Sequence, residues 1–252
     1  MIVAMRPFPI LALLCLALAQ PLAAESPDAL IKRAKLILED DFNRSEKDDS
    51  KEQLGREWVT NSEKRAHGVK QADLKDGNLV ITMAAGANHS VSVRHDAPFD
   101  DGIVQVRFKL HDAKGIKFNF NDPKANKVSW AGHIARVVVT PKSVSIGDDK
   151  KGVFDLKIRE QRQNKEISQS DKAKLDAFLK TKTAVFKNPL KENHWYELTI
   201  ANTGPKFEVY IDNQKVGEFI SEGLDHKVKQ NLAFGVSGKA TIDDLKIWTL
   251  NR

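Results

Sequence analysis

The sequence contains a single cysteine, Cys15, which lies within an apolar segment near the N-terminus. If that segment is removed, the remaining chain has no thiol at all. Disulfide bonds, thiolate zinc sites and cysteine nucleophiles are then excluded together. The folded protein must therefore be held together by its hydrophobic core alone.

Long hydrophobic runs are scarce as well. The N-terminal run from Ile10 to Ala19 has ten residues, whereas a membrane-spanning helix needs about 20. Arg6 precedes this run, and small residues suited to cleavage follow it. This order predicts a secretory signal peptide over residues 1–24. We therefore expect a secreted or periplasmic protein that has no membrane span after cleavage.

Several catalytic and metal-binding motifs are absent. The seven histidines show neither the H-E-x-x-H nor the H-x-H spacing of a metal site. The chain also has no G-x-S-x-G motif, no glycine loop that would cradle phosphates, and no dinucleotide fingerprint. We therefore expect no organic cofactor, and calcium is the one ion considered below.

What the sequence does contain is a regular series of reverse-turn signals. From Asp76 onward they recur every 8 to 15 residues, and apolar and polar residues alternate between them. Short strands at this spacing, without intervening helices, are typical of a β-sandwich. With 252 residues, of which 41% are hydrophobic, the chain is long enough for one such domain. We expect residues 36–252 to form it, after a short helix or linker over residues 25–35.

Alternation within these segments assigns residues to the two faces of each strand. The apolar residues of one face in each segment are Val104, Val106, Phe108 and Leu110, and then Ile116, Phe118 and Phe120. The opposite faces are polar and carry Gln105, Arg107, Lys109 and His111, and then Lys117, Asn119 and Asn121. The apolar faces predict the core. The polar faces predict a sheet surface that is suited to hold a sugar.

Residues 150–191 break the strand pattern. Asp171 to about Lys180 has helical periodicity, and Ser168 precedes it at the spacing of a capping box. The segment carries twelve Lys/Arg against five Asp/Glu, a net charge of +7. The rest of the chain after residue 24 sums to about −2, so the basic character belongs to this one helical insert.

The C-terminal strands carry a resemblance to a known superfamily. The stretch WYELTI…FEVYIDNQKVGEF…FGVSGKATIDDLKIW, together with DDF at residues 40–42, resembles the concanavalin A-like lectin/glucanase superfamily. More narrowly, the chain resembles the secreted 3-keto-disaccharide hydrolase family, long described as a domain of unknown function; GHIARVVVTPKSVSIGDDKKG (residues 132–152) shares this likeness. The resemblance covers residues 36–250. It implies an all-β, antiparallel jelly-roll β-sandwich with one short helical insert, in which the first strand pairs with the last.

The resemblance does not settle whether the chain is an enzyme. The β-glucanases of this superfamily carry E-x-D-x-x-E on one strand, because a retaining glycosidase needs two carboxyl groups about 5–5.5 Å apart. The nearest match here, EDDFNRSE, has Arg44 in place of the second glutamate. Hydrolysis of that kind is not expected, and fold alone does not carry activity across such a superfamily.

Pairs of adjacent aspartates include those at residues 40–41, 100–101, 148–149 and 243–244. Adjacent side chains on a strand point to opposite faces, so we expect solvated turns or strand ends rather than catalytic pairs. Calcium is the alternative, because hard cations bind clustered oxygens. If the first and last strands pair, Asp40 or Asp41 on the first strand lies beside Asp243 or Asp244 on the last strand. Asp41 with Asp244 is the predicted calcium site.

Polar and aromatic residues on the non-core faces are the strongest candidates for ligand binding. Asn and Arg offer paired hydrogen-bonding groups to hydroxyls, and Trp stacks on the apolar face of a pyranose. The predicted ligand-binding residues are Arg107, His111, Asn119, Asn121, Trp130, His133 and Arg136. The simpler interpretation is a solvated sheet face.

These observations support two kinds of function. The first is a carbohydrate-interacting protein, either a binding module or a hydrolase of small or oxidised (3-keto) saccharides. The second is a non-catalytic structural envelope protein whose basic insert docks on a partner or on a polyanion such as acidic polysaccharide. The insert residues expected to meet the polyanion are Lys157, Arg159, Arg162, Lys165, Lys172 and Lys174. A solvated helix is the simpler interpretation of these charges.

The formal net charge of +6 is too small, averaged over the chain, to predict nucleic-acid binding. The sequence does not predict an oligomeric state.

Overall fold

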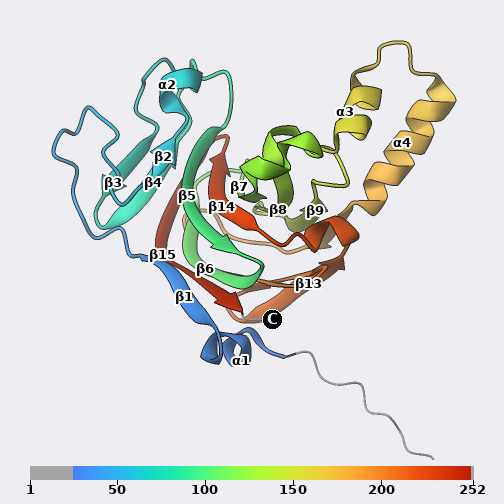
Figure 1. Cartoon of the computed structure of the whole chain (residues 1–252). Helices are drawn as coiled ribbons and strands as arrows, with labels where there is room; N and C mark the ends of the chain where they lie inside the picture. The colour runs from blue at the N-terminus through green and yellow to red at the C-terminus, as the bar shows by residue number, and fades with distance from the viewer. Residues whose placement is uncertain (1–24, 251–252) are drawn as a thin grey trace, which may run out of the picture.

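The structure is a computed structural model that describes residues 25–250. The predicted signal peptide, residues 1–24, lies outside the described residues. Two antiparallel β-sheets face each other as a sandwich, with short helices at the edges (Figure 1). The predicted antiparallel β-sandwich is confirmed.

The first sheet, called sheet A here, has eight strands. Its order is β13 (Gln214–Ile220), β12 (Lys206–Ile211), β11 (Trp195–Thr203), β6 (Asp101–Leu110), β15 (Lys239–Leu250), β4 (Asn78–Thr82) and β3 (Ala72–Lys75). Strand β1 (Lys35–Asp40) pairs with β15, with Asp40 opposite Leu245. The predicted pairing of the first and last strands is therefore confirmed.

The second sheet, called sheet B here, has seven strands. Its order is β10 (Thr183–Lys187), β9 (Ser143–Asp148), β8 (His133–Val139), β7 (Ile116–Asn121), β14 (Lys229–Val236), β5 (Val91–Phe99) and β2 (Val59–Thr60). Consecutive strands β6 and β7 thus belong to different sheets. This crossing between sheets decides which polar residues can share a site.

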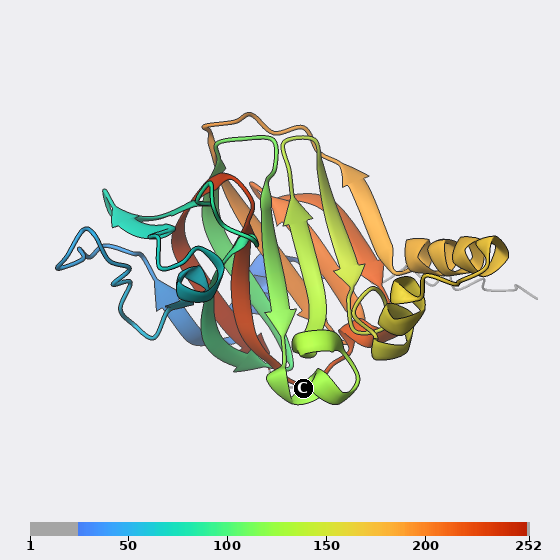
Figure 2. The same ribbon diagram turned by 90° about the horizontal axis from the view of Figure 1, so that it is seen from above.

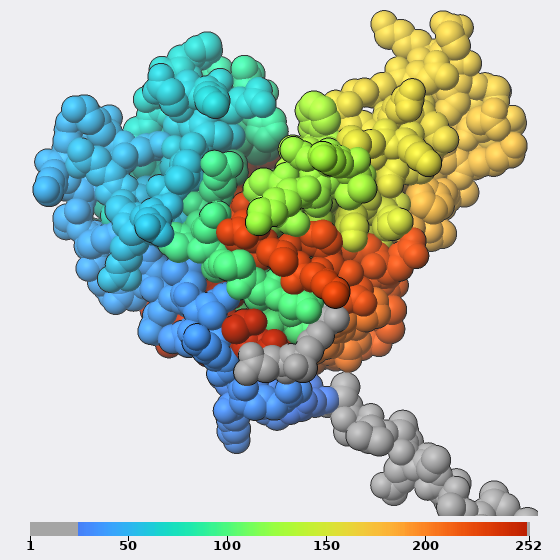
Figure 3. Space-filling view, viewed as in Figure 1, coloured from blue at the N-terminus to red at the C-terminus, as the bar shows by residue number. Residues whose placement is uncertain are grey.

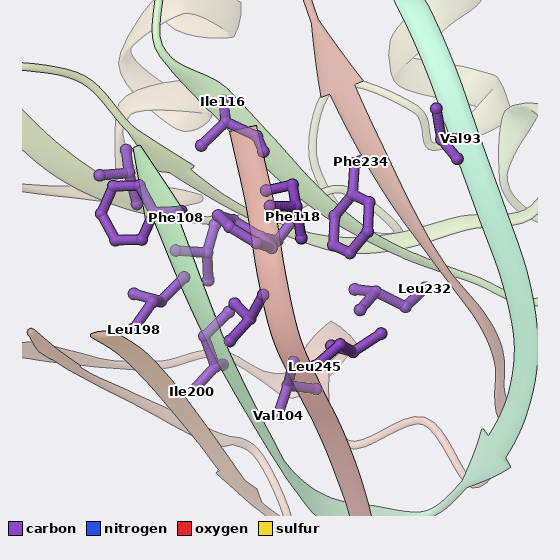
Figure 4. Close-up of a cluster of buried hydrophobic side chains, with 14 of the residues drawn as sticks. Val93, Val104, Phe108, Ile116, Phe118, Leu198, Ile200, Leu232, Phe234 and Leu245 are labelled. Carbon is purple, nitrogen blue, oxygen red and sulfur yellow. The ribbon is translucent and has the colours of Figure 1, made fainter. Parts of the chain in front are cut away.

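The inward faces of both sheets form one apolar core. Phe108 of β6 and Phe118 of β7 are completely buried, as their alternation predicts. Side chains from both sheets, such as Leu198 and Phe234, point into the same layer (Figure 4). Each such side chain contributes about 1.5–3 kcal/mol when it is removed from water. In a fold without disulfides, this layer supplies most of the stability.

A buried carboxylate links the end of β1 to the opposite sheet. Asp40 accepts hydrogen bonds from Arg44 Nη1 at 2.6 Å, Trp58 Nε1 at 2.7 Å and Phe42 N at 2.9 Å. Burial alone would raise the pKa of Asp40, but the hydrogen bonds from Arg44, Phe42 and Trp58 lower it. The Trp58 ring stacks on Phe234 of sheet B, with centroids 5.6 Å apart. Asp40 is therefore a structural residue.

The insert contains two helices, α3 (Leu156–Gln163) and α4 (Gln169–Thr181). The predicted cap of α4 is confirmed, since Ser168 Oγ accepts from Asp171 N at 3.1 Å. The helical insert is confirmed, and its periodicity predicts α4 but not α3. Helix α3 has no buried residue, so its sequence lacks the apolar periodicity that marks an amphipathic helix. It is capped instead by the Asp155 side chain, which accepts from Lys157 N at 2.9 Å.

The remaining helices are short. They are α1 (Pro27–Lys32), α2 (Ser62–Arg65) and the 3₁₀ turns η1 (Pro123–Lys127), η2 (Trp130–Gly132) and η3 (Glu222–Leu224). Across residues 25–250, no helix has the length and apolar character needed to cross a membrane.

The outer face of sheet B forms the floor of a hollow. Figure 2 looks onto this face, with α2 beyond one edge and the α3–α4 insert beyond the other. In the space-filling view, the molecule is hollowed between the cyan lobe around α2 and the yellow insert (Figure 3). The η1–η2 segment, which joins β7 to β8, borders the same hollow.

The core assignment predicts the effect of a buried charge on β12. Val209 is completely buried, together with Phe207 and Ile211. Val209→Asp places an unpaired carboxylate in the core, which costs several kcal/mol of a total stability of about 5–15 kcal/mol. We expect this variant to lose its cooperative thermal unfolding transition.

Val185→Asp is the matched control, because Val185 is 67% exposed on strand β10. This variant should unfold within a few degrees of the wild type. Equal melting temperatures for Val209→Asp and the wild type would show that the core assignment of β12 is wrong.

Candidate functional site

A groove of about 580 Å³ lies on the outer face of sheet B. Volumes of about 300–1,000 Å³ are typical of small-ligand sites. The groove is lined from the sheet by Val91, Ser92, Lys117, Asn119, Asn121, His133, Arg136, Ala233 and Gly235, and from its borders by His89, Ser90, Trp130, Val153, Phe154 and Arg162. No aspartate or glutamate is among the lining residues that the structure describes.

The floor of the groove is flat because its central residues are small. Ala233 and Gly235 lie on β14, directly beside Asn119 and Lys117 of β7. A Cβ atom on Gly235 would lie 3.1 Å from Asn119 Nδ2, so a larger residue would crowd this amide. Asn119 Nδ2 donates to the Ala233 carbonyl at 3.3 Å, which orients the amide across the floor.

One wall is an imidazole stacked on a phenyl ring. His133 and Phe154 lie with centroids 4.1 Å apart and planes inclined by 22°. Burial, and secondly the positive charges of Arg136 and His89, lowers the pKa of His133 to about 4. The imidazole is therefore neutral at neutral pH. It offers one donor and one acceptor rather than a charge.

A buried ion pair supports the same wall. The guanidinium of Arg136, on β8, pairs with the carboxylate of Asp149, whose side chain is completely buried. Gly147 makes room for this guanidinium, because a Cβ atom there would lie 3.0 Å from Arg136 Cζ. Burial, and secondly the positive charge of Arg162, lowers the pKa of Arg136. Asp149 therefore holds in place a cation whose partial burial would otherwise be costly.

Two polar atoms in the groove wall lack partners within residues 25–250. Asn121 Oδ1 and His133 Nδ1 are buried and make no hydrogen bond there. The other end of the Asn121 amide donates to Asn231 Oδ1 at 2.9 Å, which fixes its orientation. Buried polar atoms without a partner are rare in folded proteins, and they mark a place where a polar ligand or water can bind.

The rim of the groove carries an exposed tryptophan. Trp130 is 48% exposed, which is unusual for so large an apolar ring. The Arg159 guanidinium of α3 lies over this ring at 3.9 Å from its centroid. This cation–π contact holds the indole in one orientation at the rim.

Five of the seven predicted ligand-binding residues meet in this groove: Asn119, Asn121, Trp130, His133 and Arg136. Arg107 and His111 do not, because β6 belongs to sheet A and its polar side faces the opposite surface. His111 there contacts Asn193 and Thr241 through its two ring nitrogens, at 2.7 and 2.8 Å. The expectation of one shared surface is wrong for these two residues. Alternation identifies the outer side of a strand but not the sheet to which the strand belongs.

The predicted calcium residues lie on the outer side of sheet A. Strand β15 has a register shift between Asp243 and Lys246, and Asp244 has a φ of 44°. This bulge brings both aspartates to Arg107 Nη1, at 3.0 and 3.1 Å. Adjacent side chains therefore converge here, contrary to the expectation for a regular strand.

Asp41 contributes to the electrostatics of the same area. Burial, and then the neighbouring Asp244 carboxylate, raises the pKa of Asp243; Asp41 adds to this effect and Arg107 opposes it. Among residues 25–250, no group of three or more His, Cys, Asp or Glu side chains is arranged to hold a metal ion. Calcium between Asp41 and Asp244 stays a prediction, with Arg107 already paired to Asp244.

The aspartate pair at residues 148–149 is not solvated as expected. Both side chains are buried: Asp149 pairs with Arg136, and Asp148 accepts from Ser221 Oγ at 2.5 Å and Gly223 N at 3.1 Å. Their partners lie on distant segments, so nothing local in the sequence distinguishes this pair from a surface turn.

The six predicted polyanion-binding residues do not form one patch. Arg159 stacks on Trp130, Arg162 lines the groove, and Lys174 pairs with Asp171 at 3.1 Å. Arg162 also lines, together with Lys165 and Lys172, a second pocket between α3 and α4, and Lys157 is exposed at the start of α3. The insert is thus partly a wall of the groove and partly a separate basic surface.

Several groove residues were missed from the sequence. Lys117 was assigned to a polar face but not to a site, and His89, Phe154 and Arg162 were not linked to the sheet. His89 and Phe154 lie in connecting segments that have no periodicity to interpret. Arg162 was assigned only to the insert, because the contact of α3 with the η1–η2 segment, through Arg159 and Trp130, joins separate segments of the chain.

The lowered pKa of His133 predicts a pH-dependent stability. The unfolded chain binds a proton at His133 below about pH 6.5, whereas the folded protein binds it only near pH 4. Stability is therefore lost as the pH falls through this window, by up to about 3 kcal/mol. His133→Asn should remove that part of the loss. The measurement is urea unfolding of both proteins from pH 7 to pH 4.5.

The difference in stability between the wild type and His133→Asn at each pH reports on His133, because the other titrating groups are the same in both proteins. Parallel loss of stability in the wild type and in His133→Asn would contradict a neutral, buried imidazole.

No protein-family model matches the chain, and no curated protein matches it. Among solved structures, it is similar to a non-specific endo-β-1,3(4)-glucanase from family GH16, with 13% identity, a TM-score of 0.53, and coverage of 87% of this chain and 92% of that one. It is also similar to a laminarinase from Flavobacterium sp. UMI-01, with 16% identity, a TM-score of 0.52, and coverage of 85% and 100%.

A third similar structure is a GlcNAcα1-4Gal-releasing endo-β-galactosidase from Clostridium perfringens, with 10% identity and a TM-score of 0.55. The match covers 86% of this chain and 63% of that one. At these identities the likeness establishes the fold alone. They support the jelly-roll β-sandwich fold, while the resemblance to the concanavalin A-like superfamily and to the 3-keto-disaccharide hydrolases stays a prediction.

Proposed function

We propose that the protein binds a saccharide in the groove on the outer face of sheet B. The observation that carries this proposal is the lining of the groove, which combines amides, a neutral imidazole and an exposed indole over a flat floor. Asn119 and Asn121 offer donors and acceptors to hydroxyl groups, and Trp130 offers a ring face or edge to the apolar side of a pyranose. The similar solved structures include an endo-β-galactosidase and an endo-β-1,3(4)-glucanase, which supports the same ligand class.

The proposal is for binding rather than for hydrolysis by paired carboxylates. Such hydrolysis needs two carboxyl groups about 5–9.5 Å apart across the sugar. No described lining residue is acidic, and Asp149, whose carboxylate pairs with the lining residue Arg136, is itself buried. Turnover of small or oxidised (3-keto) saccharides, which the resemblance implies, is a finer proposal for the same groove. It would require chemistry other than that of the glucanases.

Export of the chain is also a proposal, and it rests on the signal-peptide pattern of residues 1–24. A secreted or periplasmic location would place the groove where extracellular saccharides are found. The envelope alternative, docking of the insert on a polyanion, is supported by the exposed lysines Lys157, Lys165 and Lys172.

The test compares two tryptophans on opposite surfaces. A glycan array first identifies a bound oligosaccharide, and calorimetry then measures its affinity for the wild type and two variants. Trp130→Ala should weaken binding about tenfold, because an aromatic contact contributes roughly 1.4 kcal/mol. The control, Trp195→Ala, removes a tryptophan of sheet A that lies beneath Arg107, and it should bind like the wild type.

Melting temperatures of both variants should remain close to that of the wild type, since Trp130 is half exposed and Trp195 is only partly buried. Unchanged affinity in Trp130→Ala, or weakened affinity in Trp195→Ala alone, would place the site outside the groove. An array without any ligand would contradict the proposed function.

A further inference from the structure

The groove is lined by cations from three separate elements. Lys117 comes from β7, Arg136 from β8 and Arg162 from α3. None of the described lining residues carries a negative charge. A groove lined by one sign of charge concentrates ligands of the opposite sign.

These three cations are not equivalent. Arg136 is paired with the buried carboxylate of Asp149, so its charge is already compensated. Lys117 and Arg162 have no ion-pair partner within residues 25–250. Arg162 makes one hydrogen bond there, from Nη1 to the Val153 carbonyl at 3.0 Å. The rest of its donor fork therefore has no protein acceptor within the described residues.

The opposite surface of the sandwich provides the comparison. On sheet A, Arg107 pairs with Asp243 and Asp244, and Lys215 pairs with Glu208 and Glu218. These two basic side chains thus have acidic neighbours on the same sheet, whereas Lys109 of β6 lies over the ring of Trp195. The groove differs in that none of its described lining residues is acidic.

The proximity of the cations also has an electrostatic consequence. The positive charge of Arg162 lowers the pKa of Arg136, so the two guanidinium groups repel each other across the wall. A bound anion would be attracted to both groups. The planar fork of arginine suits a carboxylate or a sulfate, which can accept two parallel hydrogen bonds.

We infer that the ligand of the groove is an anionic saccharide, whose carboxylate or sulfate group is bound by Arg162 and Lys117. This inference rests on the proposed saccharide-binding function and names its substrate class. The sugar ring lies over the floor at Ala233 and Gly235, and the acidic group lies toward α3. The insert then contributes directly to recognition, as the wall that selects charge.

The test uses one saccharide backbone in a charged and an uncharged form. Calorimetry measures the binding of trigalacturonate, its fully methyl-esterified form and a sulfated galactose trisaccharide. At least one anionic form should bind about tenfold more tightly than the neutral ester, because a charge-assisted hydrogen bond is lost in the ester. The stronger of the two anions assigns the group as carboxylate or sulfate. Raising the salt concentration should weaken the anionic ligand but not the ester.

Variants of Arg162 and Lys117 test whether these two cations cause the preference for the anionic saccharide over the ester. Arg162→Gln and Lys117→Gln should each remove most of the preference for the anion, measured as the ratio of the anion affinity to the ester affinity in the same variant. Lys165→Gln is the matched control, because Lys165 follows α3 closely in sequence but does not line the groove. All three side chains are exposed, so folding should not change.

The outcomes separate the two proposals. Equal affinity for ester and anions would overturn the anionic inference and leave saccharide binding intact. An anion preference that survives both groove variants and is lost in Lys165→Gln would move the charge recognition to the insert surface and also overturn the inference. Binding to none of these three, beside a neutral oligosaccharide that the glycan array identifies, would overturn the inference alone, whereas an array without any ligand would overturn the proposed function and the inference with it.

Discussion

Two β-sheets that face each other across a single apolar layer leave each strand only one face for ligands. Packed sheets lie about 10 Å apart, and in this protein residues such as Phe108 and Phe118 fill the space between them completely. The two outer faces are therefore separate surfaces that share no residue. Every functional assignment in the molecule follows from the sheet to which a strand belongs. Strands β5, β7, β8 and β14 can build one site together, whereas β6 and β15 cannot join it.

The two outer faces differ in shape and in charge. Sheet B is bordered by the η1–η2 segment and the insert, so its face is a groove, and the cations there include two without acidic partners. Sheet A is the surface on which Arg107 is neutralised by Asp243 and Asp244. Buried contacts position the side chain of Arg136 in the groove wall. Its guanidinium pairs with Asp149, and Gly147 leaves room for it. The insert therefore adds a cation, Arg162, to the outer face of sheet B.

Much of the fold could be predicted from the sequence, because alternation and turn residues are local signals. The burial of Val106, the capping of α4 by Ser168 and the pairing of β1 with β15 agree with those predictions. The site was only partly predictable. Residues 119 and 121 were found because they alternate with core phenylalanines. Arg107 was wrongly grouped with them, because two consecutive strands that lie in different sheets show the same alternation.

Other features of the site depend on contacts between distant segments. Helix α3 buries no residue and so has no periodic signal, although it carries Arg159 and Arg162 to the groove. Asp149 looks like one half of a solvated turn until its partner on β8 is known. The bulge that brings Asp243 and Asp244 to the same guanidinium is likewise set by the pairing of β15 with β6. These are tertiary constraints, which local patterns do not encode.

The central claim is that the ligand binds on the outer face of sheet B, at the rim formed by Trp130. The sequence has four tryptophans, and they report on four different places. Trp58 is bonded to Asp40, Trp130 borders the groove, Trp195 lies on sheet A, and Trp248 packs beside Leu30 of α1. The most direct test is a titration of the ¹⁵N-labelled protein with its saccharide, followed through the four indole N–H signals. We expect the Trp130 signal to shift while the other three stay in place, whereas a shift of the Trp195 signal without one at Trp130 would contradict this account.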